Sequence, residues 1–520
     1  MIRITNSMMN NNTKNNINLN KTNADMLNTM VASGQKITKP SDDPVIAIRA
    51  LRLNTDLSQL NQYYDKNIPD AEAWMTITET ALSQTDGIFT SIKENLTTGA
   101  SDDNTASDRM KILESLKGLR DQIYSSGNAD YAGRTVFTGY RTSESLTYLD
   151  TDTDKNHEIT VHQTFDLDDF EKGYEYITTY DDSDPAKQLE QTVEKIPVNR
   201  LRLAYDNIDS AEGYSGGTDG AIVVTKTDGT VGATVKLTTV STVGKSQQDI
   251  DKLYTTVPAG EAILIKETGE VIIGGTALSS IEGVSDIKDI SIEYNKKQWD
   301  SGDLRPEHYF ACHDKTDDIY YNYDQKDNGS GKMVTDPTKP NFKEQDLQIE
   351  ISYNQTIAIN THASDVFPHD IGRDVDDLIK ATQAVVDLDN NIADVEKQLS
   401  KATDTATKEA LQNKLDALNK QYAFCKDRMQ KMFSNGLDRF DGYSDKTNLA
   451  IANIGSMRGR VSVTKERVAD QLMSFKKLAD DNINASLTDT AIDLKNAELA
   501  LEAAQMSSAK IAQQTLLNYL

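Results

Sequence analysis

Residues 43–60 read DPVIAIRALRLNTDLSQL and mark the start of a long helix. Asp43 is a suitable N-cap, because its carboxylate can accept from the free N–H groups of the first turn, and Pro44 fits the first helical position, where no N–H is needed. From Ile46 the mostly apolar positions recur alternately every four and three residues as far as Ile92. This heptad spacing predicts a helical rod of about 70 Å over 46–92 at ~1.5 Å per residue. Pro69 predicts a kink or break in that rod.

Helical spacing returns in five more stretches of the chain. Ile112, Leu116, Leu119 and Ile123 predict a shorter helix. After residue 365, one apolar seam covers 378–399 and a second covers 411–432, which predicts an antiparallel helical hairpin. Further rods are predicted through 461–475 and through 487–517, the last rich in alanine.

The middle of the chain has a different pattern. Residues 221–226 and 233–237 flank Asp228-Gly229, which predicts a β-hairpin. A second hairpin is predicted from 262–265 and 271–273, and 347–353 alternate as a strand does. The predicted fold class is therefore α+β: a long antiparallel helical bundle or coiled-coil rods from both termini, with an inserted β-rich domain.

This order of helix, strand and helix predicts three domains. The first is a terminal helical domain that packs on assembly, from residues 1–44 plus 484–520. The second is a long-helix bundle, from 45–141 plus 366–483. The third is a β-rich outer domain, from 142–365.

Both terminal segments carry an apolar stripe without an obvious partner. Asparagine is frequent in residues 6–28, so this segment is a weak helix former by itself. We expect the two stripes to fold fully when neighbouring subunits cover them. The predicted assembly interface consists of Ile17, Ala24, Leu27, Val31, Leu494, Leu501, Ile511, Leu516, Leu517 and Leu520.

Composition excludes several classes of function. The 520 residues include 55 basic and 81 acidic side chains, a formal net charge of −26, so we expect no nucleic-acid partner, because phosphate binding needs a basic face. Mean hydropathy is −0.56, and no apolar run of about 18 residues occurs, so we expect no membrane insertion. The first residues lack the apolar core of a Sec-type signal peptide, and we expect none.

No motif supports catalysis or a cofactor. Asp150, Asp152 and Asp154 begin like a calcium loop, but the glycine and glutamate that such a loop needs are absent, which favours a solvated acidic loop. His308, Cys312 and His313 are close in sequence, yet no second Cys/His pair completes a zinc set, which favours ordinary packing. We therefore predict no enzyme, no cofactor and no metal site.

Several motifs together resemble the flagellin superfamily of bacterial axial proteins. They are Met1-Ile-Arg-Ile-Thr-Asn6, Ala32-Ser-Gly34, Lys39-Pro-Ser-Asp-Asp-Pro44, Asn128–Gly139, Gly302–Phe310 and Ile511–Leu520. The Lys-Pro-Ser-Asp-Asp-Pro version is closer to the hook–filament junction group than to filament flagellin, in which an alanine usually stands at the place of Pro44.

The resemblance implies a structural subunit of the bacterial flagellum at the hook–filament junction. Its implied partners are hook-associated protein 1, flagellin, further copies of itself in a ring, and a flagellar export chaperone. It also implies an extracellular location after export through the flagellar type III apparatus. Two alternatives stay open, a filament-forming flagellin and a flagellar scaffold that displays a glycan-binding β domain.

Overall fold

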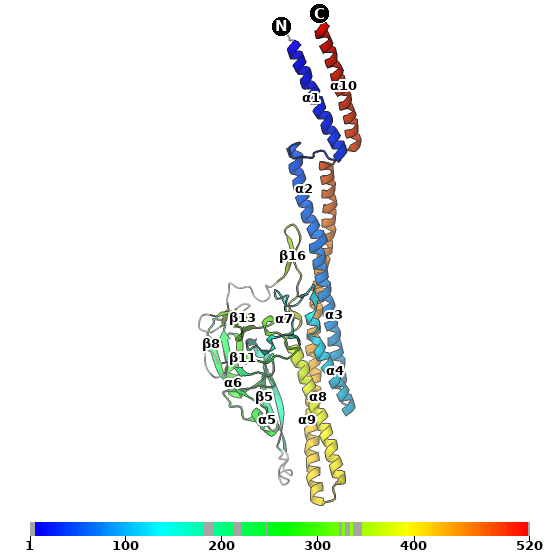
Figure 1. The fold of residues 1–520 in the computed structure, drawn as a ribbon. Coiled ribbons are helices and arrows are strands. Elements are labelled where there is room, and N and C mark those ends of the chain that lie inside the picture. The colour runs from blue at the N-terminus through cyan, green and yellow to red at the C-terminus, as the bar shows by residue number, and fades with distance from the viewer. Residues whose placement is uncertain are drawn as a thin grey trace. The chain divides into compact units, whose positions relative to one another are not determined.

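The computed structural model describes residues 6–179, 192–212, 220–245, 247–321, 325–327, 333–335 and 346–517. The chain forms two compact units. The terminal unit comprises Met1–Glu72, Ile349–Ile357 and Gly459–Leu520, and the central unit comprises Ala73–Gln348 and Ala358–Arg458. Long helices from both ends of the sequence and an inserted sheet confirm the predicted α+β class (Figure 1). The three-domain division stays a prediction.

The long helices follow the predicted seams. Their bounds are α1 Asn6–Ser33, α2 Pro44–Gln62, α3 Ile68–Gly99, α4 Ala106–Ile123, α8 Asp370–Lys401, α9 Thr405–Ile483 and α10 Leu487–Leu517. Shorter helices are α5 Gln247–Thr255, α6 Gly275–Glu282 and α7 Ala363–Val366. The predicted cap of α2 is confirmed, because the Asp43 carboxylate accepts from the backbone N–H groups of Val45 and Ile46 at 2.9 and 3.2 Å.

The structure shows no break at Pro69, but a π-helical turn precedes it. This turn, Tyr63–Asn67, separates α2 from α3, and Pro69 is the second residue of α3. Proline has no backbone N–H to donate to the hydrogen-bond pattern of a helix. A π turn shifts this pattern by one residue without ending the helix.

Two stretches predicted as separate rods, 411–432 and 461–475, belong to the single helix α9. The stretch between them, 433–460, contains four glycines, which are poor helix formers. A seam at exact seven-residue spacing nevertheless continues through it, and its members are Phe433, Phe440, Thr447, Ile454, Val461 and Val468. All six are almost completely buried, so a threonine at an apolar position hid the continuity in the sequence.

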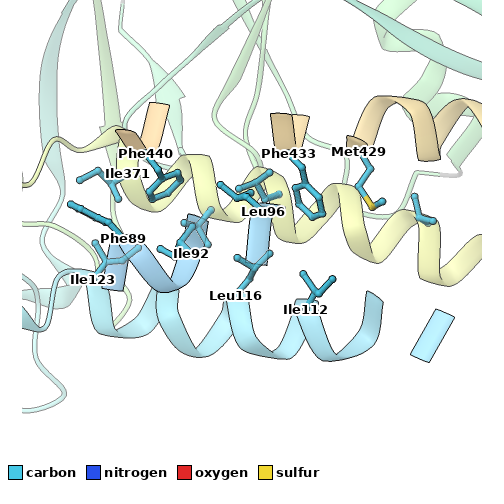
Figure 2. Close-up of a cluster of buried hydrophobic side chains, with 13 residues drawn as sticks. Phe89, Ile92, Leu96, Ile112, Leu116, Ile123, Ile371, Met429, Phe433 and Phe440 are labelled. Carbon is cyan, nitrogen blue, oxygen red and sulfur yellow. The ribbon is translucent and has the colours of Figure 1, made fainter. Parts of the chain in front are cut away.

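The predicted hairpin of 378–399 with 411–432 is confirmed in α8 and α9. Leu388 and Val395 of α8 pack with Leu415 and Leu418 of α9. Nearer the sheet, α3, α4, α8 and α9 together enclose one apolar core (Figure 2). The labelled side chains in that view include Phe89, Ile92, Leu96, Ile112, Leu116, Ile123, Ile371, Met429, Phe433 and Phe440.

The insert is built on one large sheet, in the order β13-β12-β3-β11-β7-β8-β9-β10-β5-β4, with β6 beside β11. Strands β8 and β9 pair in parallel, and the other described pairs of this sheet are antiparallel. The strand bounds are β3 Ile159–Phe165, β4 Glu171–Thr179, β5 Thr192–Arg202, β6 Ser210–Ala211, β7 Gly220–Lys226, β8 Val231–Val240, β9 Ala262–Ile265, β10 Glu270–Ile273, β11 Ile287–Lys296, β12 Ala311–Asp314 and β13 Ile319–Tyr321.

Three small antiparallel pairs complete the strands. They are β1 Asp130–Tyr131 with β2 Arg134–Thr135, β14 Gln325–Asp327 with β15 Met333–Thr335, and β16 Gln348–Ser352 with β17 Gln355–Ala358. The two predicted hairpins are confirmed as β7–β8 and β9–β10. Gly229 and Gly269 turn them with φ of +80° and +65°, a backbone conformation that glycine adopts readily.

Buried ion pairs hold the sheet against the helices of the central unit. Arg202 of β5 reaches Asp377 and Asp374 of α8, each at 2.7 Å. Asp374 also accepts from the guanidinium of Arg439 at 2.7 Å and from the hydroxyl of Tyr443 at 2.8 Å, both on α9. Paired charges of this kind fix an orientation, because breaking one pair leaves a buried charge uncompensated.

Glu171 of β4 extends this network and gives it a pH dependence. Desolvation opposes its ionisation, but Arg200 and Arg439 more than offset this and lower the pKa of Glu171 to about 2. A carboxylate whose pKa is lower in the folded state stabilises the fold at pH values above its unfolded-state pKa. This stabilisation is lost as the pH falls through the folded-state pKa. We therefore expect the melting-temperature difference between wild type and Glu171→Gln to shrink between pH ~4.5 and pH ~2.

Circular dichroism melts at a series of pH values measure this difference. Glu114→Gln is the matched control, because Glu114 pairs with Lys117 on an exposed helix face. A Glu171→Gln difference that does not change between pH 6 and pH 2 would contradict the assignment.

Candidate assembly surface

The first and last helices lie side by side and antiparallel (Figure 1). In each helix the covered positions alternate every four and three residues. On α1 these are Thr13, Ile17, Asn20, Ala24, Leu27 and Val31, and on α10 they are Thr490, Leu494, Ala497, Leu501, Ala504 and Ser508. The Asn20 amide donates to the carbonyl of Ala500 at 3.4 Å. The pair is therefore a two-helix coil whose small seam residues allow close approach.

This pairing places most of the predicted interface residues in one intrachain seam. Six of them are half-buried there: Ile17, Ala24, Leu27, Val31, Leu494 and Leu501. Ile511, Leu516 and Leu517 belong to α10, but their side chains lie outside the described part, and Leu520 lies outside the described residues altogether. The contact of these ten residues with a neighbouring subunit stays a prediction.

A short backbone junction connects the two chain segments that lead into this pair. Gln35 and Asn484 form an isolated antiparallel bridge. Lys36 N–H donates to the carbonyl of Ile483 at 2.7 Å, and Ala485 N–H donates to that of Gly34 at 2.9 Å. Gly34 has φ +70° and ends α1 by donating to the carbonyl of Met30.

Replacing Gly34 by alanine tests the junction. No atom would meet the new Cβ within 4 Å, so the cost is conformational, about 1–2 kcal/mol for a left-handed residue. We expect amide hydrogen exchange in α1 to accelerate roughly five- to thirty-fold. Gly87→Ala is the control, because Gly87 has helical φ inside α3 and equally open space. Unchanged exchange in the Gly34 variant would contradict this role.

A second apolar stripe on α10 faces away from α1. Ile492, Leu499 and Met506 recur every seven residues and are 56%, 55% and 60% exposed. At 100° per residue this stripe lies opposite the seam that contacts α1. This stripe is not among the residues predicted for the assembly interface, because that prediction assigns the seam residues to the contact between subunits. The seven-residue repeat itself was the signal that could have revealed it.

Exposed apolar residues are concentrated in the terminal unit. On α1, Leu19 and Met26 are 67% and 51% exposed and are also seven residues apart. More than half of the large apolar side chains that are exposed in the described residues belong to this unit, although it contains just over a quarter of the chain. Contiguous exposed apolar surface typically marks an interaction site.

Charge favours association at the same helices. Helix α1 carries two lysines and one aspartate, and α10 carries two lysines and four acidic residues, so together they amount to −1. The whole chain carries −26. Since like charges keep proteins apart, the nearly neutral helix pair opposes contact between copies only weakly.

The motif at residues 39–44 has a structural role in the same unit. Backbone N–H groups of Lys39 and Thr38 donate to the Asp42 carboxylate and lower the pKa of Asp42. Asp42 therefore closes the turn, and Asp43 caps α2. The strand pair β16–β17 contacts the π turn, where the Tyr63 hydroxyl donates to Glu350 at 2.9 Å, and desolvation raises the pKa of Tyr63.

The residues considered for zinc from the sequence have separate environments. The Nε2 atom of His308 lies 3.0 Å from the Ser145 carbonyl oxygen. Cys312 is buried in β12, and the neighbouring His313 stacks on Tyr320 with ring centroids 3.8 Å apart. Among the described residues these three side chains form no common cluster of ligand atoms. No helix in the described part has an apolar stretch that could cross a bilayer.

Comparison with known proteins agrees with the motifs at the N-terminus. Residues 4–142 match the bacterial flagellin N-terminal helical region. Flagellar hook-associated protein 3 of Salmonella typhimurium is 30% identical over 117 residues, which are 22% of this chain and 37% of that protein. The Escherichia coli protein of the same name is 29% identical over 113 residues, 22% of this chain and 35% of that protein. The chain thus spans about a third of the length of these relatives.

Solved structures of similar proteins were also found. Xanthomonas campestris FlgL aligns over 82% of this chain and 99% of its own, with 12% identity and a TM-score of 0.30. The flagellar junction protein FlgL from Legionella pneumophila aligns over 80% and 99%, with 11% identity and a TM-score of 0.27. The match of residues 4–142, together with the similarity to the two hook-associated proteins, confirms the predicted resemblance of this region to the bacterial flagellin superfamily.

Proposed function

We propose that this chain is a structural, non-enzymatic subunit of the bacterial flagellum that forms the junction between the hook and the flagellin filament. The observation that carries the proposal is the similarity of its N-terminal region to two proteins named flagellar hook-associated protein 3. The paired terminal helices support a structural role, because they leave apolar stripes on their outer faces.

These stripes suit assembly in a ring better than a single strong contact. Full burial of an Ile, Leu or Met side chain contributes about 1.5–3 kcal/mol, so half-exposed Ile492, Leu499 and Met506 could add about 3–5 kcal/mol together. Association of two proteins costs roughly 4–15 kcal/mol. One stripe alone therefore does not hold two copies together, whereas several contacts made at once around a ring do.

The proposed partners follow from this location. One side of the ring contacts hook-associated protein 1, the other contacts flagellin, and copies of the chain contact one another laterally. Before assembly an export chaperone covers α10, whose outer stripe is otherwise exposed. The chain leaves the cell through the flagellar type III apparatus and functions outside it.

Deletion of the gene tests the proposal. We expect electron microscopy to show hooks without filaments and immunoblots to show flagellin in the medium, with both defects restored by the wild-type gene. Intact filaments in the deletion strain would contradict the proposal. Bare hooks with flagellin antigen missing from cells and medium would instead identify this chain as the filament subunit.

A further inference from the structure

The segment 141–148 leads from the helices into the β-rich insert, and the chain comes back to this segment at 302–308, between β11 and β12. Tyr148 N–H donates to the Asp303 carbonyl at 2.9 Å, and Arg305 N–H donates to the Leu146 carbonyl at 3.0 Å. Thr147 and Leu304 form an isolated bridge between them. The outgoing segment, 141–148, and the returning segment, 302–308, are therefore paired side by side.

Three potential metal ligands meet where these segments run together. Glu144 lies on the outgoing segment, and Glu307 and His308 lie on the returning one. One carboxylate oxygen of each glutamate and one ring nitrogen of His308 are all within 4.8 Å of one another. Glu307 is 4% exposed and His308 is 1% exposed, so two of the three ligands come from the protein interior.

The hydrogen bonds of His308 leave one ring nitrogen available. Nε2 lies 3.0 Å from the Ser145 carbonyl oxygen, which can only accept, so Nε2 carries the proton. Nδ1 is buried without a hydrogen-bond partner and keeps its lone pair. An imidazole with one protonated and one free ring nitrogen is neutral, the form that binds metals.

The surrounding charges leave an excess of negative charge. Arg305 pairs with Asp152 and Asp154, each at 2.7 Å, and with Glu307 at 3.3 Å. The prediction of a solvated loop is therefore wrong for Asp152 and Asp154, because both bind a buried guanidinium. Glu144 pairs with Arg141 at 3.5 Å. These four carboxylates face two guanidinium groups, a deficit of two positive charges.

We propose that Glu144, Glu307 and Nδ1 of His308 bind one divalent transition-metal ion, preferably Zn²⁺. A neutral imidazole with two carboxylates is a donor set that Zn²⁺ accepts, with a water molecule in the fourth position. Bonds of ~2.0–2.2 Å place tetrahedral ligand atoms about 3.3 Å apart, so the side chains must close slightly. The Glu144 side chain is 40% exposed and has the freedom to do so.

A bound ion would supply the missing double charge and fasten the outgoing segment to the returning one. A second group of metal-ligating side chains, His157, Asp314 and Asp317, provides an internal comparison. There the Nδ1 atom already lies 2.7 Å from Asp314, so this histidine has a partner. We assign the metal to the Glu144 site for that reason.

Titration of the untagged, metal-stripped full chain tests the site. We expect isothermal titration calorimetry to show one equivalent of Zn²⁺ bound, a higher melting temperature with the metal, and a Co²⁺ absorption band in the visible range. Glu144→Gln and His308→Gln should weaken binding at least about 100-fold and remove the band. His157→Gln is the matched control and should retain both.

The Glu144 and His308 variants together distinguish loss of the metal site from loss of folding. Glu144 is partly exposed, so its glutamine variant should fold even if a change at buried His308 does not, and circular dichroism verifies each variant. Full affinity in Glu144→Gln, or loss of binding in His157→Gln, would overturn the assignment. The absence of saturable Zn²⁺ and Co²⁺ binding to the wild-type chain would also overturn it.

Discussion

Replacing Ile492, Leu499 and Met506 together by glutamate is expected to abolish incorporation of the chain into the flagellum while leaving it folded. These side chains are more than half exposed and lie opposite the seam with α1. Their replacement therefore removes no packing within the chain, and each exposed change should alter unfolding by no more than about 0.5 kcal/mol. Three added charges would each have to be desolvated at a subunit contact, which costs far more than the apolar contact contributes.

Complementation of the deletion strain measures this effect. We expect no swimming in soft agar and no restored filaments with the triple variant, although immunoblots show that it is made. The matched control replaces Met110, Leu149 and Leu449, which are exposed in the central unit, by glutamate. The control should swim. A stripe variant that swims as the wild type does would show that this face of α10 is not an assembly surface.

Asp374→Ala is expected to destabilise the central unit by about 3–5 kcal/mol. Its carboxylate is 5% exposed and accepts from Arg202, Arg439 and Tyr443. The alanine variant leaves Arg202 and Arg439 with one fewer partner each, and the sheet loses one of its attachments to α8 and α9. The free energy of unfolding in urea, followed by circular dichroism, measures the loss.

Two further variants make this result specific. Asp374→Asn keeps hydrogen-bond acceptors without the charge, so it should fall between wild type and Asp374→Ala. Asp387→Ala is the matched control on the same helix, because Asp387 contacts only Gln383 at an exposed position among the contacts seen here. An Asp374→Ala protein within about 0.5 kcal/mol of wild type would contradict the role of this network.

Local features of the fold were predictable because nearby residues determine them. Asp43-Pro44 specifies the start of α2, and Gly229 follows the turn residue Asp228 between two alternating strands. The heptad seams likewise predicted α8 and the start of α9. The full length of α9 was not predicted, because Thr447 occupies a buried position in the seam where the heptad pattern requires an apolar residue.

Features that join distant residues were not predictable. Arg202 and Asp374 are far apart in the sequence, as are Glu144 and His308, and no local pattern relates them. The terminal stripes were recognised, but a single helix pattern does not show which partner covers which face. The structure pairs the two seams with each other, and the outer stripe that contains Leu499 remains exposed.

The position of the chain in isolated flagella shows whether it is a junction subunit. An epitope tag inserted in the exposed turn at 227–229 between β7 and β8 can be labelled with gold on purified hook–filament structures. We expect label confined to the boundary between hook and filament. Label distributed along the filament would contradict it and identify a filament flagellin, and flagella without label would exclude the chain from the structure.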